Sequence, residues 1–445
     1  MIRRLFIANR GEIALRITHT ARRMGIETIL GVSEADRTSL PARMADHVVL
    51  LGPAPSSQSY LDVDRVVAAA AGAKADAVHP GYGFLSENSR FARAVAAAGM
   101  IFIGPSPESL DAMGDKLKAR AVGLAAGMAV VPGGEAEDRE AARRRANETG
   151  YPLLIKAVSG GGGRGMKRVN RDDELDSQIA LAMAEAQAAF GDPRIYIERY
   201  IARGRHVEVQ VLGDGRRAIH LGTRDCSIQR RFQKLVEEAP APDIPEERHE
   251  ALRAAAVRLA EYLGYSGAGT VEYLVDAESF DFYFLEMNAR IQVEHPVTEA
   301  VTGIDLVEQQ LLIADRQPLG IAQDDVKVTG HAIEVRINAE DWTADFRPSP
   351  GKVARAAWPA GPGIRVDTHI ESGGAVPPYY DSLMGKLIVQ GAGRREAIAR
   401  MAAALDTLEI DGVASTAPMH RAIMADPRFA AGAVDTRFFE ELARG

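Results

Sequence analysis

The stretch 153-LLIKAVSGGGGRGM-166 breaks an apolar strand with a run of glycines. Glycine lets the backbone take positive φ, so that amide N–H groups can face a phosphate without an intervening side chain. The stretch is not a Walker A loop, because no Gly-Lys-Ser/Thr closes it. Nor is it a dinucleotide-binding turn, because it leads into a strand rather than a helix. It therefore suits a polyphosphate, and a merely flexible surface loop is the alternative.

Strand-like and helical segments alternate on both sides of this loop. The N-terminal part alternates expected helices near 11–24 and 60–73 with expected strands at 4–8, 27–32, 47–51 and 101–104. This alternation is typical of parallel βαβ units and predicts a first α/β domain. A small unit between residues 130 and 205 holds the glycine loop and two helices, which predicts an inserted lid that can move.

From residue 206 onward, the pattern changes to alternating β segments joined by hairpins. The expected hairpins join 206–212 to 217–221 and 269–275 to 281–287. This region predicts a larger α+β domain that runs to the C-terminus.

The composition is that of an ordinary globular protein. The chain has 445 residues, of which 46% are hydrophobic and 26% charged, which predicts two to four domains rather than a disordered scaffold. Its net charge of −8 disfavours a nucleic-acid or anionic-membrane surface. The single cysteine, Cys226, excludes an internal disulfide and a multi-cysteine zinc site. With no secretory segment and no apolar run of about 20 residues, we expect a cytoplasmic protein.

Polar and apolar residues alternate along 284-FLEMNARIQVEH-295. Successive side chains on a strand point to opposite faces, so one face is expected to carry Glu286, Asn288, Arg290, Gln292 and Glu294. A solvated surface strand is the alternative, but these residues are poor strand formers, which favours a functional face. Glu272 can join Glu286 across a hairpin to offer hard oxygen ligands for Mg²⁺. Arg290 can hold an anion, and Glu294 can act as a base.

Basic residues that could meet anionic substrates lie in three places. Lys156 ends the strand before the glycine loop, and Lys116 lies in 113-MGDK-116. Each of these lysines taken alone is most often a solvated surface charge. The stretch 224-RDCSIQRRFQK-234 gathers three arginines and Lys234, and a solvated basic face is again the alternative. Beside an acidic metal site, this cluster would suit an anionic second substrate.

Taken together, these segments resemble the biotin carboxylase family, the ATP-grasp subunit of biotin-dependent carboxylases such as acetyl-CoA carboxylase. The resemblance covers essentially the whole chain. A generic ATP-grasp ligase would share the glycine loop and the metal carboxylates, but not the longer motifs. The matching stretches, besides the glycine loop and the basic cluster, are 7-IANRGEIALRI-17, 79-HPGYGFLSEN-88, 113-MGDK-116, 237-EEAPAP-242, 286-EMNARIQVEHPVTE-299, 334-EVRINAED-341, 348-PSPGK-352 and 377-PPYYDSLMGKLI-388.

The resemblance implies a three-domain ATP-grasp fold of mixed α/β and α+β type. The expected parts are an N-terminal doubly wound domain over 1–113, a linker over 114–130, a mobile lid over 131–203, a central ATP-grasp domain over 204–330 and a C-terminal biotin carboxylase domain over 331–445.

It also implies a site for ATP with Mg²⁺ or Mn²⁺ between the lid and the central domain. The phosphates would meet Lys116, Lys156, Gly161, Gly162 and Gly163, with His206 and Gln229 near the nucleotide. Adenine would lie in an apolar slot that includes Met166 and Leu274, read by Glu198 and the backbone at Ile201. The metal would be held by Glu272, Glu286 and Asn288.

For the second substrate, the resemblance implies that bicarbonate binds to Lys234, Arg290, Gln292 and the Val293 backbone amide. Glu294 would remove its proton, and the anion would attack the γ-phosphate to give carboxyphosphate and ADP. Carboxyphosphate would then give CO₂ and phosphate, and phosphate could take the N1′ proton of biotin. Arg336 would stabilise the ureido enolate that captures CO₂, with Tyr82 beside the biotin.

The partners follow from the same resemblance. Because the sequence contains no Met-Lys-Met biotinyl motif, biotin is expected on a separate biotin carboxyl carrier protein. A carboxyltransferase on another chain would choose the final acceptor. We also expect a homodimer, with no nucleic-acid or membrane partner.

Three positions depart from the family pattern: Phe232 stands where His is usual, Arg199 where Lys is usual and Thr416 where Asn is usual. Phe232 removes a possible hydrogen-bond donor near the phosphates. Two other functions therefore stay open at this point. One is another ATP-grasp ligase, of the carboxylate–amine or formyl-transfer type, and the other is a nucleotide-binding subunit without turnover.

Overall fold

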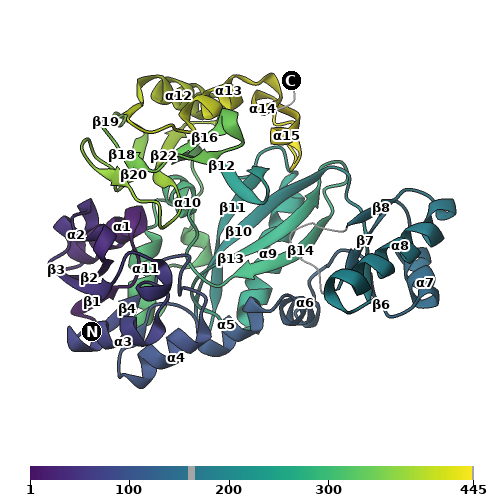
Figure 1. Cartoon of the computed structure of the whole chain (residues 1–445), viewed down its shortest axis with the longest axis horizontal. Helices are drawn as coiled ribbons and strands as arrows, with labels where there is room; N and C mark the ends of the chain where they lie inside the picture. The colour runs from purple at the N-terminus through teal and green to yellow at the C-terminus, as the bar shows by residue number, and fades with distance from the viewer. Residues whose placement is uncertain (159–165, 443–445) are drawn as a thin grey trace.

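The computed structural model describes residues 1–158 and 166–442. The expected phosphate contacts Gly161, Gly162 and Gly163 lie outside the described residues. Figure 1 shows three regions around a central sheet, with the N-terminal domain in purple, the C-terminal segment in yellow above it and the lid extending to the right.

The N-terminal domain is a doubly wound parallel sheet, as the sequence predicts. Its strand order is β3-β2-β1-β4-β5, and the strands are β1 (Arg4–Ile7), β2 (Glu27–Ser33), β3 (His47–Gly52), β4 (Ala77–His79) and β5 (Ile101–Phe102). The helices are α1 (Gly11–Arg23), α2 (Leu40–Met44), α3 (Val63–Gly72) and α4 (Ser89–Ala97). Leu5 and Ile7 pack with α1, whereas Phe6 packs with α3 and α4 on the opposite face, because side chains alternate along a strand.

Two short helices connect this domain to the lid, α5 (Pro107–Gly114) and α6 (Lys116–Ala125). The lid has its own four-stranded sheet in the order β6-β9-β7-β8. Its elements are β6 (Gly133–Ala136), α7 (Arg139–Thr149), β7 (Leu153–Ala157), β8 (Lys167–Val169), α8 (Asp172–Phe190) and β9 (Ile195–Arg199). Leu153, Ile155 and Ile197 pack against residues of both helices in a core separate from the rest, which agrees with a self-contained lid.

The central sheet has eight antiparallel strands in the order β14-β13-β10-β11-β12-β15-β22-β20. These strands are β10 (Gly204–Asp214), β11 (Ala218–Arg230), β12 (Gln233–Ala239), β13 (Ser266–Asp276), β14 (Phe282–Asn288), β15 (His331–Asn338), β20 (Ile364–Thr368) and β22 (Leu383–Gly391). Strands β12 and β15 pair directly, with Glu237 opposite Glu334. One sheet therefore continues through residue 330, where the sequence predicts a domain boundary.

Helices and small strand pairs complete this region. The helices are α9 (Glu246–Tyr262), α10 (His295–Thr302), α11 (Leu306–Ala314), α12 (Arg394–Thr407), α13 (Ala417–Ala425), α14 (Pro427–Ala430) and α15 (Phe438–Leu442). The strand pairs are β16 (Glu340–Asp341) with β17 (Arg347–Pro348), β18 (Gly351–Lys352) with β21 (Ala375–Val376), and β19 (Arg355–Ala357) with β23 (Glu409–Asp411). In the described part of the chain, no helix has the length and apolar character needed to cross a membrane.

One secondary-structure prediction is wrong. The strand expected over 284–295 ends at Asn288, and residues 289–294 form an irregular segment before α10 begins at His295. Strand β14 is an edge strand, and side chains rather than a neighbouring strand bind the backbone beyond it. Glu87 accepts a hydrogen bond from the Ala289 amide at 3.2 Å, and Lys386 donates to the Val293 carbonyl at 2.8 Å. These bonds replace the missing sheet ladder.

The first prediction concerns a buried ion pair within the central sheet. Arg205 lies on β10 and donates to Asp225 on β11 at 2.7 and 3.0 Å, and both residues are buried. Because Arg205→Met leaves the Asp225 charge buried without its partner, we expect the free energy of unfolding to fall by about 3–5 kcal/mol. Urea unfolding followed by circular dichroism measures this change.

The matched control is Arg248→Met, since Arg248 lies 3.5 Å from Asp281 in an exposed pair. Exposed pairs contribute little, so this variant should unfold like the parent chain. Equal unfolding midpoints for the two variants would contradict the assignment of Arg205 as a buried structural charge.

Candidate active site

One face of the central sheet carries a row of three carboxylates. Glu208 on β10 lies opposite Glu272 on β13, and Glu272 lies opposite Glu286 on β14. Glu208 is fully buried, Glu272 is 5% exposed and Glu286 is half-buried. The antiparallel register brings these carboxylates together, because directly paired residues have Cβ atoms about 5 Å apart.

Lys234 on β12 joins this row to Glu294. Its Nζ atom lies 2.6 Å from Glu208 Oε2, 2.8 Å from Glu272 Oε1 and 2.7 Å from Glu294 Oε1. An ammonium group has three N–H donors, and each of them meets a different carboxylate. Lys234 is therefore the electrostatic centre of the site.

Glu294 lies between two cations. Its second oxygen, Oε2, accepts from Arg336 Nη2 at 2.9 Å, and Arg336 also donates from Nε to Glu237 at 2.7 Å. Both carboxylates are fully buried. Arg336 on β15 thus holds Glu294 on one side and Glu237 on the other.

A planar guanidinium lies beside this cluster. Arg290 donates to Asn288 Oδ1 at 2.8 Å, to Gln292 Oε1 at 3.0 Å and to Glu87 at 3.0 Å. The amides of Asn288 and Gln292 in turn donate to Glu272 Oε1 at 2.8 and 3.1 Å. A fork of N–H donors next to two amides suits a small planar oxyanion.

Opposing effects determine the pKa values of these groups. Burial acts to raise the pKa of Glu294, but Lys234, Arg336 and Arg224 outweigh it and hold that pKa well below the usual range. Burial raises the pKa of Glu237 to about 7, against the lowering by Arg336, and the nearby Glu294 charge adds to the rise. The two carboxylates that share Arg336 are therefore split, with Glu294 the more acidic.

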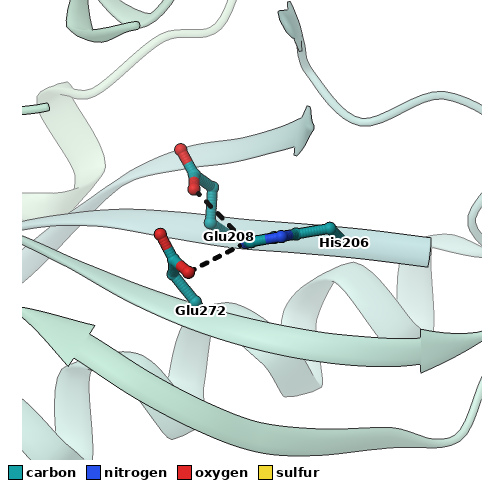
Figure 2. A group of neighbouring side chains, drawn as sticks. All are labelled: His206, Glu208 and Glu272. Carbon is teal, nitrogen blue, oxygen red and sulfur yellow. Dashed lines mark ion pairs between the residues drawn. The ribbon is translucent and has the colours of Figure 1, made fainter. Parts of the chain in front are cut away.

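Two groups of side chains offer candidate ligand atoms within 4.8 Å of one another. They are His206 with Glu208 and Glu272, shown in Figure 2, and Cys226 with Glu208 and Glu294. Lys234 already binds the carboxylates of both groups. Burial raises the pKa of the Cys226 thiol well above its usual value, so that thiol is a poor ligand. These clusters are therefore organised around the ammonium ion.

A hard divalent cation fits better at the edge of the sheet. The paired carboxylates of Glu272 and Glu286 and the amide of Asn288 lie on adjacent strands, and oxygen donors of this kind suit Mg²⁺. His206 Nε2 lies 3.0 Å from Glu272. Burial acts to lower the pKa of His206, but Glu272 outweighs it and raises that pKa, which favours a cationic imidazole over a metal ligand.

The residues expected around the nucleotide lie on the lid and the adjoining strands. Lys156 and Glu198, on neighbouring lid strands, form an ion pair. Leu274 and Ile201 both lie close to Gly204, whereas Met166 is 42% exposed. Gln229 Nε2 donates to the Cys226 carbonyl at 3.3 Å. Lys116 begins α6, and its side chain lies outside the described structure.

Several buried charged residues of the site are absent from the sequence prediction. Glu208 occupies the same strand face as His206 in 206-HVEVQVL-212, so that alternation could have revealed it. Glu237 lies in a motif that matched the family, but no role was assigned to it. Glu12 and Lys386 lie about 370 residues apart in the sequence and meet at 3.2 Å, and the spacing of residues cannot predict such a contact.

The second prediction concerns the protonation of Glu294. Lys234→Met removes one of the cations that lower its pKa, so the pKa of the Glu294 carboxyl should rise by about 1–3 units. The wild-type carboxyl should then stay ionised to more acidic pH than the variant carboxyl. Carbon NMR of labelled glutamate side chains can follow this titration.

The assignment in that experiment uses Glu294→Gln, which should remove the resonance. Lys327→Met, which changes an exposed lysine, is the control and should leave the titration unchanged. A Glu294 pKa that is the same with and without Lys234 would contradict the proposed electrostatic control.

Comparisons with known proteins agree with this arrangement. Three family models match: "Biotin carboxylase, N-terminal domain" over residues 1–110, "Carbamoyl-phosphate synthase L chain, ATP binding domain" over 115–322 and "Biotin carboxylase C-terminal domain" over 334–441. A biotin carboxylase from Pseudomonas aeruginosa is 49% identical over 445 residues, which cover 99% of this chain and 98% of that protein. The propionyl-CoA carboxylase alpha chain from Ruegeria pomeroyi is 46% identical, with 99% of this chain and 68% of that longer protein covered.

A solved structure gives the same result. It is the biotin carboxylase domain dimer of the Hydrogenobacter thermophilus 2-oxoglutarate carboxylase, in complex with MgADP, ADP and bicarbonate. It is 44% identical, covers 99% of this chain and 98% of its own, and superposes with a TM-score of 0.88. With its three-part ATP-grasp fold and its identity over nearly the full length, this chain belongs to the biotin carboxylase family.

Proposed function

We propose that this chain catalyses the ATP-dependent carboxylation of biotin by bicarbonate with Glu294 as the base and Arg336 as the group that holds biotin. The overall reaction is that of the family, the first half-reaction of biotin-dependent carboxylases. The observation that carries the residue roles is the position of Glu294. Its buried carboxylate lies between Lys234 and Arg336, next to the oxyanion cradle.

The cradle binds and orients bicarbonate. Arg290 supplies a charged fork, and Gln292 and the Val293 amide supply further donors. Glu294 takes the proton, and the resulting oxyanion attacks the γ-phosphorus of ATP to release ADP. Lys234 stabilises the negative charge as it develops, because a preorganised cation in a buried site needs no reorganisation during the reaction.

The nucleotide side requires a divalent cation and the lid. Glu272, Glu286 and Asn288 would hold Mg²⁺, which when bound neutralises phosphate charge. Lys116, Lys156 and the loop glycines 161–163 would contact the phosphates. Met166, Glu198, Ile201, His206, Gln229 and Leu274 would surround the rest of the nucleotide. Closure of the lid would exclude water from carboxyphosphate, which water would destroy.

The biotin side lies at Arg336 and Tyr82. Carboxyphosphate gives CO₂ and phosphate, and phosphate accepts the N1′ proton of biotin. The ureido oxygen then carries negative charge, which the Arg336 guanidinium stabilises while N1′ attacks CO₂. The product is N1′-carboxybiotin.

The arrangement of partners is also part of the proposal. The relatives are subunits or domains of biotin-dependent carboxylases, which implies a biotin carrier and a carboxyltransferase. We place both on separate chains, because the sequence lacks a Met-Lys-Met biotinyl motif. A homodimer is supported by the dimer of the Hydrogenobacter domain. The cytoplasmic location and the five expected domain boundaries stay predictions.

The third prediction tests the base. Glu294→Gln keeps the size of the side chain but removes proton acceptance, so bicarbonate-dependent ADP release should fall by about 10²–10⁴-fold. ATP binding, measured by calorimetry, should change little. Glu396→Gln, on an exposed glutamate, is the control.

The same assay separates the biotin role. Free biotin should increase ADP release by the wild-type chain, and Arg336→Ala should abolish that increase. ATP cleavage that ignores both bicarbonate and biotin would contradict the proposal and favour a different ATP-grasp ligase. Binding of ATP without cleavage would favour the subunit without turnover.

The fourth prediction concerns Phe232. Its ring is 75% exposed at the turn between β11 and β12, where φ is +67°, so a histidine fits without a steric clash. Phe232→His restores a donor near the phosphates, and one hydrogen bond of about 1 kcal/mol should lower the KM for ATP about fivefold. Steady-state ADP release gives this KM, and Phe232→Leu is the control without a donor. Equal KM values for the His and Leu variants would exclude this role.

A further inference from the structure

Lys386 on β22 has no role in the proposed chemistry, although its side chain is fully buried. Its Nζ atom donates to the Val293 carbonyl at 2.8 Å and lies 3.2 Å from Glu12 Oε1. Asp367 lies farther away at 3.9 Å and is paired with Arg365 at 2.7 and 2.8 Å. Lys386 therefore connects three separate parts of the fold: β22, the first turn of α1 and the irregular segment 289–294.

The bond to Val293 fixes the peptide unit that leads into the base. A peptide group is planar, so the Val293 carbonyl and the Glu294 amide move as one unit. This bond is trans, since the cis bonds of the described chain precede Pro152 and Pro240. A fixed Val293 carbonyl thus fixes the direction of the Glu294 amide and the start of its side chain.

A second side chain fixes the neighbouring peptide unit. His295 Nδ1 lies 2.7 Å from the Gln292 carbonyl, and that carbonyl shares a plane with the Val293 amide. The Val293 N–H, the donor proposed for bicarbonate, therefore points away from His295. Lys386 and His295 together orient two successive peptide units without a strand partner.

Lys386 also reaches the biotin side of the site. Its other partner, Glu12, accepts a hydrogen bond from the Tyr82 hydroxyl. Burial raises the pKa of Glu12 while Lys386 lowers it, so the lysine is the group that favours the charged carboxylate. The chain Tyr82–Glu12–Lys386–Val293 thus runs from the residue expected beside biotin to the segment expected to hold bicarbonate.

We propose that Lys386 is a positioning residue, which orients the peptide between Val293 and Glu294 and ties it through Glu12 to Tyr82. This inference rests on the proposed function, because it needs Glu294 to be the base. Lys386 touches neither substrate. Its effect is to keep the base and the bicarbonate donor in register with the biotin side.

The experiment compares Lys386→Met with the double variant Lys386→Met/Glu12→Gln. The single variant leaves the Glu12 carboxylate buried without its cation and should melt at a lower temperature. The double variant removes both charges and should regain most of the wild-type melting temperature. A purely structural role would then restore activity together with stability.

A positioning role gives a different result in the double variant. We expect kcat/KM for bicarbonate to stay about 100-fold below that of the wild-type chain, since a small misplacement of a catalytic group has effects of this size. The KM for ATP should be unchanged. Lys327→Met, which changes an exposed lysine that also donates to a backbone carbonyl, is the control and should behave like the wild type.

The link to Tyr82 has its own readout. Tyr82→Phe should lower kcat/KM for bicarbonate in the wild-type background and have no further effect in the double variant, because coupled residues are not additive. A double variant with wild-type kcat/KM for bicarbonate overturns the inference, and so does one that loses ATP binding and stability together. If the wild-type chain itself shows no bicarbonate-dependent cleavage, the proposed function fails instead, and the wild-type assay alone reveals this.

Discussion

The contact of one buried ammonium group with three carboxylates is the interaction on which the site depends. Lys234 binds Glu208, Glu272 and Glu294 at 2.6–2.8 Å, and two of these acids, Glu208 and Glu294, are fully buried. Charges buried without a partner would be strongly destabilising. Arg224 reinforces the arrangement by donating to Glu208 at 2.5 Å. The sheet can therefore hold so many acids on one face only because cations are built between them.

The same cations create a tension in the proposed chemistry. A carboxylate whose pKa is held low is a weak base, so proton transfer from bicarbonate to Glu294 is unfavourable when that step is taken alone. Lys234 and Arg336, however, also lie where the negative charge of the deprotonated substrate would develop. What the cations remove from the basicity of Glu294, they return as stabilisation of the anion that it forms. The higher pKa of Glu237, about 7, shows that position relative to Lys234, rather than burial alone, separates the two acids.

Much of the fold and part of the site could be predicted from the sequence. Periodicity identified the parallel N-terminal domain, the lid elements and the hairpin of β13 and β14, because each depends on local patterns. The strand predicted over 284–295 was wrong beyond Asn288, although its polar residues do converge. Alternation continues through 289–294 because an extended segment also alternates, and only the partners Glu87 and Lys386, remote in sequence, distinguish it from a strand. Cross-links of this kind leave no periodic signal.

The division of labour between the two sheets follows from their cores. Residues from Glu272 on the nucleotide side to Arg336 on the biotin side belong to one continuous sheet, and the lid packs around its own apolar cluster. A lid with a separate core can change its position without repacking the central sheet. The reacting groups are fixed by cross-strand register and by ion pairs within the central sheet, so closure need only bring the phosphate contacts and exclude water. An acid-rich site with a weak base depends on this separation, because even a small shift among Lys234, Glu294 and Arg336 would change both the base and the charge that stabilises its product.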